Sequence, residues 1–306
     1  MRKYTGIEIL RIICACAIPL LHIRLTGNVA YYLQQYVARL GVPFFFAISG
    51  MFLSQSLKKC SAETAWKKYI AKTGRLFFVW LAIYSPLLFL TGSLTLKEIV
   101  FKTPAFLWYI GSMMVASIPF CFIQNRKTLY VIAGALYIIG TIFGDTYKWL
   151  TGGIPIYEQV FITTRNGLFF ALPIMLVGEK VWTLKVKHIS YLIMSGILLF
   201  AEISMVGAFI EKGSDRSMYL TIPLFIGLSL RAIIGWNPTI RCSYLGGIST
   251  AIYLMQYGII TVGYALFDRM GSESIWNNYI IYLLVIIVPS LFYIAVKDTK
   301  VPKILF

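Results

Sequence analysis

The chain has 306 residues, of which 58% are hydrophobic and only 13% are charged, and this composition excludes an ordinary soluble protein. So much apolar surface cannot be buried inside a water-soluble particle of this size, and most of it must contact lipid. The formal net charge of +16 would favour nucleic acid in a soluble protein, but here it indicates where cations lie relative to the bilayer, so no nucleic-acid partner is expected.

Ten predominantly apolar segments are long enough to cross a bilayer, which requires about 17 to 25 residues. We predict helices at 6–25, 37–55, 72–91, 106–124, 128–144, 163–181, 188–209, 218–235, 246–266 and 277–296. With the N-terminus in the cytoplasm, the inner segments carry eighteen lysines and arginines and three acids, which is the bias expected of cytoplasmic loops. The sequence therefore predicts an all-α, polytopic bundle of about ten transmembrane helices in the cell membrane, one domain over residues 1–306 with both termini cytoplasmic.

The first predicted helix carries three ionisable residues at membrane depth, where such groups cost about 2.5–3.5 kcal/mol on insertion scales. Arg11 and His22 are eleven residues apart, so on a straight α-helix they point the same way with about 16 Å of rise between them. Glu8 lies one turn before Arg11 and can pair with it. Pro19 is expected to kink the helix just before His22, which is typical of helices that line a cavity. The alternative is that His22 is a buried histidine near the interface while Arg11 and Glu8 snorkel.

The second and third predicted helices begin with cations. Arg39 is expected at the outer mouth of the second helix, which also contains the small residues Ser49 and Gly50 that allow close helix approach. Lys72 and Arg75 are three residues apart at the cytoplasmic start of the third helix, so they are neighbours on one face and suit a phosphorylated ligand. Ordinary anchoring by positively charged inner residues explains the same pair.

Several of these residues form an ordered set that resembles the acyltransferase-3 family of integral membrane acyltransferases. The set comprises Arg11-x10-His22, the R-x-x-V-P-x-F-F-x-x-S-G pattern from Arg39 to Gly50, and the basic pair that enters the third helix. Leu107-Trp108-Tyr109 is similar to the family's Leu-Trp-aromatic segment, and the stretch from Ser249 to Gln256 is similar to its late S-x-x-I-Y-L-x-H stretch. The resemblance extends over essentially the whole chain.

The resemblance implies transfer of an acetyl or other short acyl group from cytoplasmic acyl-CoA to a hydroxyl of a cell-surface or lipid-linked glycan. It implies that His22 is the essential catalytic residue, for which we expect a general-base role, and that Arg11 supports the catalytic and donor sites. It further implies that Lys72 and Arg75 bind the phosphates of the donor. This sequence departs from the family in having Lys72 where an arginine is expected, which weakens bidentate phosphate binding, and Gln256 where a late histidine is expected.

Other polar residues are candidates to line the same cavity. Glu202, deep in the seventh segment, is expected to orient the His22 imidazolium or hold the acceptor hydroxyl, or else to pair with a cation of another helix. The candidate acceptor contacts are Arg39, Trp108, Tyr253 and Gln256, and helix-to-helix hydrogen bonds are an alternative for the last two. With two histidines and no suitably spaced cysteines, no metal is expected.

A transporter or flippase is the main alternative to an enzyme, because intramembrane charges are as typical of transporters as of enzymes. In that interpretation Glu8, Arg11, His22 and Glu202 serve the passage of a substrate or a proton. The internal repeats common among transporters are not visible in this sequence. The identity of the acceptor is left open, as are a homo-oligomer and the choice between direct transfer and an acyl-histidine intermediate.

Overall fold

The computed structural model describes residues 4–25, 27–90, 106–144, 163–185, 188–209, 217–236, 244–272 and 274–306, and within these ranges the chain forms helices and no β-strand. The first half contains α1 (Thr5–Ala17), α2 (Asn28–Tyr32), α3 (Gly41–Leu57), α4 (Ala62–Leu90), α5 (Trp108–Phe122) and α6 (Arg126–Ile142). The second half contains α9 (Leu172–Lys180), α10 (Ile189–Phe209), α11 (Ile222–Gly235), α12 (Leu245–Arg269), α13 (Ile275–Val296) and α14 (Val301–Leu305). The predicted all-α class is confirmed for the described residues.

Each of the ten predicted segments overlaps a described helix. Within the described residues, five helical stretches are long and apolar enough to cross a membrane by themselves, namely Asn28–Leu57, Ala62–Leu90, Ile189–Phe209, Leu245–Arg269 and Ile275–Val296. Two shorter apolar helices, Trp108–Phe122 and Ile222–Gly235, fall below that length. The chain is therefore a membrane protein, while ten membrane crossings and the cytoplasmic placement of the termini remain predictions.

The first predicted helix is not one continuous α-helix. α1 ends at Ala17, and the chain continues as the 3₁₀-helix η1 (Ile18–Leu21), which contains Pro19 and leads into His22. A 3₁₀-helix has 3.0 residues per turn, so each of its residues turns about 20° further than in an α-helix. The prediction that Arg11 and His22 share one straight α-helical stripe is therefore wrong, because the winding changes between them.

The helix that contains α3 is interrupted near its start. Between α2 and α3 lie the π-helical segment η2 (Leu33–Val37) and the 3₁₀ segment η3 (Ala38–Leu40), so Asn28–Leu57 forms one irregular 30-residue stretch. A π-helical turn inside a longer helix is frequent at functional sites. Here it carries Gln35 inward, where its side chain is buried.

Side-chain caps fix the start of three segments. Asn125 accepts a hydrogen bond from a backbone N–H at the start of α6, Asn166 does so for the π-helical segment η5 (Gly167–Ala171) that leads into α9, and Ser274 does so for α13. Asparagine and serine are preferred at these positions because their oxygens satisfy N–H groups that have no partner within the helix.

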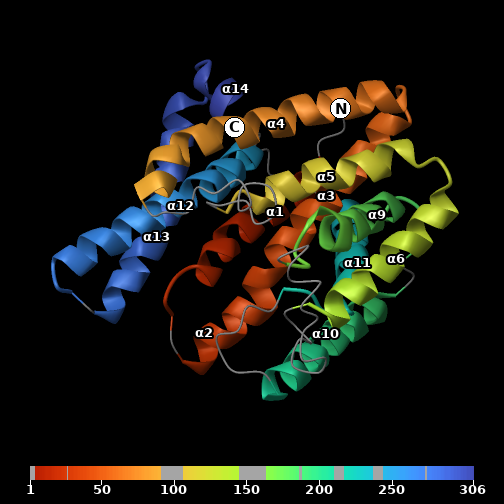
Figure 1. Ribbon diagram of the computed structural model, residues 1–306. Coiled ribbons are helices and arrows are strands. Elements are labelled where there is room, and N and C mark those ends of the chain that lie inside the picture. Colours follow the sequence, from red (N-terminus) through yellow and green to blue (C-terminus); the bar gives the residue numbers. More distant parts are fainter. Residues whose placement is uncertain are drawn as a thin grey trace.

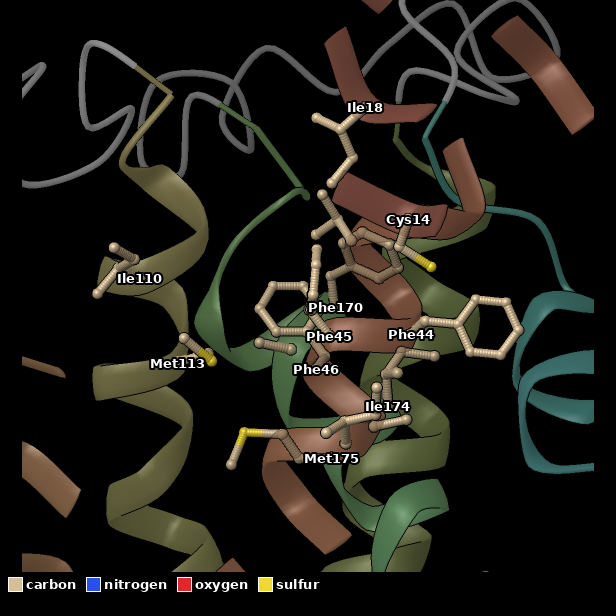
Figure 2. Packing of buried hydrophobic residues seen from close by; sticks show 14 of the residues in the cluster. Cys14, Ile18, Phe44, Phe45, Phe46, Ile110, Met113, Phe170, Ile174 and Met175 are labelled. Atoms are coloured by element: carbon tan, nitrogen blue, oxygen red, sulfur yellow. The ribbon is translucent and has the colours of Figure 1, made fainter. Parts of the chain in front are cut away.

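The core of the bundle lies where α3 crosses the η5–α9 segment (Figure 2). Phe46 of α3 packs edge-on against Phe170 of η5 with ring centroids 5.6 Å apart, and both side chains are buried. A Cβ at Gly50 would collide with the backbone of Met175, and a Cβ at Gly178 would collide with the backbone of Ala47. The prediction that Gly50 permits close helix approach is confirmed, since two glycines let α3 and α9 meet backbone to backbone.

α1 lies between neighbouring helices in the bundle. α1 packs against α3 on one side and α12 on the other, and α12 runs beside α13 at the edge of the bundle (Figure 1). α14 follows α13 and returns to α4, where the indole N–H of Trp80 donates to the carbonyl of Leu305 at 2.8 Å. The chain thereby brings α1, α3, α4, α5 and α12 around one space, which holds the candidate site.

Candidate active site

A cavity of about 520 Å³ lies between α1, α3, α4, α5 and α12. This volume is within the range of about 300–1,000 Å³ that is usual for ligand pockets. Its polar lining residues are Arg11, Ser49, Ser56, Lys68, Tyr69, Lys72, Thr73, Tyr109, Ser249, Thr250 and Tyr253. Because Lys68 and Lys72 are exposed, the cavity reaches the molecular surface at the end of the bundle where α3 leads into α4.

Arg11 enters the cavity from α1 and is held by contacts to α12. Its Nη2 donates to the carbonyl of Gly246 at 3.3 Å and to the hydroxyl of Thr250 at 3.3 Å, and its Nη1 lies 3.4 Å from the carboxylate of Glu8. A Cβ at Gly246 would approach the ends of the Glu8 and Arg11 side chains closely enough that both would have to shift, which shows how tightly the pair lies against α12. The predicted pairing of Glu8 with Arg11 is confirmed. The guanidinium is thereby fixed at the wall rather than extended into solvent.

The two lysines that line the cavity are Lys68 and Lys72, which lie one helical turn apart on α4. Residues four apart on a helix share a face. Arg75, the predicted partner of Lys72, is exposed and is not among the described residues that line the cavity, although its charge and that of Arg11 both act on Lys72. The structure therefore brings Lys72 and Arg11 to the cavity and replaces Arg75 with Lys68.

Aromatic side chains line one end of the cavity. Tyr253 of α12 packs edge-on against Tyr109 of α5 at 5.2 Å and against Phe45 of α3 at 6.3 Å between ring centroids. Elsewhere in the lining, the hydroxyls of Ser49 and Tyr69 are hydrogen-bonded at 2.7 Å. The lining thus combines two exposed lysines and Arg11 with aromatic rings, which suits a ligand with an anionic part and an uncharged part.

His22 lies beyond the aromatic end of the cavity and is not among the described lining residues. Its imidazole stacks on the ring of Phe106, with centroids 3.7 Å apart and planes inclined by 20°. The carbonyl of Phe106 accepts a hydrogen bond from the hydroxyl of Tyr253 at 2.5 Å. One residue, Phe106, therefore contacts both the predicted base and the end of the cavity.

Arg39 and Trp108 belong to a second polar cluster, formed with Arg165, Ser217 and Gln35. Arg39 donates to Gln35 at 2.8 Å and to the Ser217 hydroxyl at 3.2 Å. Arg165 also donates to Ser217, at 3.1 Å, and its guanidinium lies 5.4 Å from the centre of the Trp108 ring. The structure brings the two predicted acceptor contacts, Arg39 and Trp108, to one place, and adds Arg165 to them.

Glu202 does not lie at the cavity. Its carboxylate accepts hydrogen bonds from the backbone N–H groups of Leu220 at 2.8 Å and Thr221 at 2.9 Å, and from the Thr221 hydroxyl at 2.5 Å. These groups lie at the start of α11, where the N–H groups carry partial positive charge. The geometry assigns Glu202 a structural task, and the expectation that it orients His22 finds no contact in the described part of the chain.

Gln256 is fully buried, and neither its amide nitrogen nor its amide oxygen has a hydrogen-bond partner among the described residues. It lies three residues after Tyr253 on α12 but does not itself line the cavity. A buried amide without a hydrogen-bond partner lowers the free energy of unfolding by about 1–3 kcal/mol, so Gln256 is an unusual side chain for this interior.

Three residues that the sequence analysis missed stand out. Lys68 escaped notice because the third helix was predicted to begin at residue 72, whereas α4 begins at Ala62, and its spacing from Lys72 was the available signal. Arg165 lies near the start of the predicted segment 163–181, and its isolated charge was a signal of the same kind as Arg39. Phe106 carried no signal, because phenylalanine is common throughout this chain.

Comparison with known proteins gives the chain a family. The acyltransferase-3 family, described as an acyltransferase domain, matches residues 4–295. An amino-acid racemase of Enterococcus faecalis is 23% identical and a serine/alanine racemase of Enterococcus gallinarum is 28% identical, each over 93% of this chain. The chain covers 45% of both, so it spans less than half the length of these relatives. A second amino-acid racemase of Enterococcus faecalis is 34% identical over 55% of this chain and 27% of its own length.

No solved structure matches the chain. The family match covers nearly the whole sequence, and the apolar helices described above have the composition of membrane-spanning segments. The protein therefore belongs to the acyltransferase-3 family.

Proposed function

We propose that the protein transfers an acetyl or other short acyl group from acyl-CoA to a hydroxyl of a cell-surface or lipid-linked glycan. The donor enters the cavity between α1, α3, α4, α5 and α12, with its phosphates at the mouth and its pantetheine arm directed towards the aromatic end. The family membership supports acyl transfer, and the identity of the donor and acceptor is the proposal.

The observation that carries the proposal is the positive charge of the cavity lining. Arg11, Lys68 and Lys72 supply three cations to the lining, and the described lining contains no carboxylate side chain. Arginine and lysine are the side chains that bind phosphate, and a coenzyme A molecule carries its phosphates at one end only. The apolar and aromatic remainder of the lining suits the uncharged pantetheine arm and acyl group.

His22 is the base in this proposal. A neutral imidazole removes the proton from the acceptor hydroxyl as the oxygen attacks the thioester carbon. The carbon–sulfur bond then breaks, and the CoA thiolate takes the proton from the imidazolium and leaves as the free thiol. This type of general-base catalysis contributes about 10²–10⁴-fold in rate. The thioester must pass the aromatic end of the cavity to reach His22, because Phe106 and Tyr253 lie between them. The acceptor approaches from the side of Arg39, Arg165 and Trp108, whose donors and ring can orient a sugar.

We place the cavity mouth at the cytoplasmic face of the cell membrane, where acyl-CoA is available. The support is the excess of lysine and arginine in the segments predicted to be inside, together with the exposed Lys68 and Lys72 at the mouth. The same orientation puts His22 and the Arg39 cluster towards the opposite face, where a surface glycan is located.

Purified protein in lipid nanodiscs, supplied with radiolabelled acetyl-CoA and a membrane glycan fraction, tests the proposal. His22→Ala is expected to reduce transfer of label by at least about 100-fold. The chain offers a matched control in His188, its second and exposed histidine, whose replacement by alanine is expected to leave transfer unchanged. Full transfer by His22→Ala would remove the proposed mechanism.

A second candidate, passage of a small amino acid, is favoured by the names of the relatives. They are racemases of amino acids, including serine and alanine, and this chain matches less than half of each. The membrane part of such a protein could carry the amino acid on which the rest acts. Counterflow of labelled serine in liposomes without acyl-CoA would support this candidate, and acyl-CoA-dependent labelling of glycan in the absence of counterflow would support acyl transfer.

A further inference from the structure

We propose that Phe106 is a positioning residue for His22, and that Tyr253 couples the acyl-donor cavity to the imidazole through the backbone of Phe106. The inference rests on the proposed function, since it takes His22 as the base and the cavity as the donor site. It adds a physical connection between the two that runs through Phe106, a residue outside the lining of the cavity.

The contacts of Phe106 form a chain from the cavity to the imidazole. The Tyr253 hydroxyl, at the aromatic end of the cavity, donates to the Phe106 carbonyl at 2.5 Å. The Phe106 ring stacks on His22 at 3.7 Å, and Tyr257 packs edge-on against the same ring at 5.1 Å. The carbonyl of Phe106 therefore contacts Tyr253 while its ring contacts His22, so movement of the backbone at Phe106 must move the ring against His22.

The backbone of Phe106 is held in a conformation that phenylalanine rarely adopts. Its φ is +62°, and no other non-glycine residue in the described part of the chain has a positive φ. A side chain with a Cβ is strained in this left-handed region, so the surroundings must stabilise it. The hydrogen bond from Tyr253 and the stack on His22 are two of the contacts that do so, beside the ring of Tyr257. Loss of either favours relaxation of φ and displacement of the ring.

The stack determines how His22 can act as a base. The nitrogens of an imidazole donate and accept in the plane of the ring, at its edge. A ring stacked on one face resists rotation of the imidazole and leaves the edge open. Before the donor binds, Phe106 thereby restrains the plane of the His22 imidazole, and with it the plane in which the nitrogen accepts a proton.

A bound thioester offers the Tyr253 hydroxyl a second acceptor. The carbonyl oxygen of an acyl group at the aromatic end of the cavity competes with the Phe106 carbonyl for the same O–H donor, because a phenol has one proton to donate. When the thioester carbonyl takes this hydrogen bond, Phe106 loses a restraint on its strained backbone. Donor binding thus loosens the stack on His22 and opens the passage between cavity and imidazole.

Nuclear magnetic resonance of His22 tests both parts of the proposal. His188→Gln leaves His22 as the single histidine of the full chain, so protein labelled with ¹³C at histidine Cε1 and purified in nanodiscs gives one assigned signal. A ring stacked on the face of the imidazole shifts its Hε1 proton upfield. We expect an upfield resonance in this parent protein, retained in Phe106→Tyr, which keeps an aromatic ring, and shifted downfield in Phe106→Leu.

The coupling is tested by Tyr253→Phe, which removes the hydroxyl and keeps the ring. We expect its His22 resonance to shift downfield as in Phe106→Leu. Tyr109→Phe is the matched control, because it removes a hydroxyl from the same aromatic end and leaves the bond between Tyr253 and Phe106 in place. Acetonyl-CoA, a non-transferable ketone analogue, should move the parent resonance downfield, whereas S-ethyl-CoA, which lacks a carbonyl, should not.

Each outcome decides one part of the proposal. An unshifted resonance in Phe106→Leu overturns the positioning role. An unshifted resonance in Tyr253→Phe overturns the coupling. If Tyr253→Phe is too unstable to measure, acetonyl-CoA tests the same step in the parent protein. Equal effects of acetonyl-CoA and S-ethyl-CoA also overturn the coupling. The variants are compared without donor, so their shifts do not depend on transfer. Failure of the proposed function would instead appear as full transfer by His22→Ala.

Discussion

Comparison of Lys72→Gln with Arg75→Gln tests which member of the predicted cation pair binds the donor at the cavity. Lys72 and Lys68 line the cavity, whereas Arg75 is exposed outside it. Glutamine preserves most of the side-chain length and removes the charge. If the phosphates of acyl-CoA lie at the mouth, Lys72→Gln weakens donor binding, and the matched variant Arg75→Gln weakens it much less.

The expected magnitude follows from the exposure of Lys72. A hydrogen bond to a charged group contributes about 1.5–3 kcal/mol when it is well shielded, and an exposed ion pair contributes about 0.2–1 kcal/mol. Lys72 is an exposed residue at the edge of a cavity, so the upper end of the exposed range applies, about 1 kcal/mol. This free energy corresponds to about a fivefold rise in Kd for CoA, since about 1.4 kcal/mol is tenfold. For Arg75→Gln we expect a change of less than about twofold, from long-range charge alone.

Isothermal titration of CoA into protein in nanodiscs measures both changes without an acceptor. S-acetyl-pantetheine, which lacks all the phosphates, is the ligand control, and its affinity should be the same in parent, Lys72→Gln and Arg75→Gln. The effect of Lys72→Gln should also diminish as salt is raised, because exposed charges are screened. The reasoning is refuted if Arg75→Gln weakens CoA as much as Lys72→Gln, or if Lys72→Gln weakens acetyl-pantetheine equally.

Three further predictions concern stability, and thermal unfolding in detergent measures each. Gly50→Ala should destabilise the protein by about 2 kcal/mol or more, because its Cβ collides with the backbone of α9, whereas Gly134→Ala, whose Cβ meets nothing within 4 Å, should not destabilise it. Glu202→Gln should lower the free energy of unfolding by about 1–2 kcal/mol, because it removes the negative charge that accepts N–H groups at the start of α11. It should leave CoA affinity unchanged, and weaker CoA binding would contradict the structural role of Glu202. Gln256→Met should leave stability unchanged or raise it, and a marked loss would show that the unpaired amide has a partner.

The sequence predicted the helical membrane bundle because the relevant signals are local. Length and hydropathy of each segment depend only on neighbouring residues, and all ten predicted segments overlap a described helix. The pairing of Glu8 with Arg11 was equally predictable, since the two residues lie one turn apart on the same helix. The close approach at Gly50 followed from the absence of a side chain deep in an apolar segment.

The composition of the site depended on tertiary structure, because it is set by helix phase and by contacts between residues far apart in the chain. The start of α4 at Ala62 decided that Lys68 rather than Arg75 accompanies Lys72, and the change to a 3₁₀-helix at Ile18 separated the directions of Arg11 and His22. Glu202 met its partners only when α10 packed against α11. The stack of Phe106 on His22 and its bond from Tyr253 join three segments of the chain, and only the packed bundle brings them together.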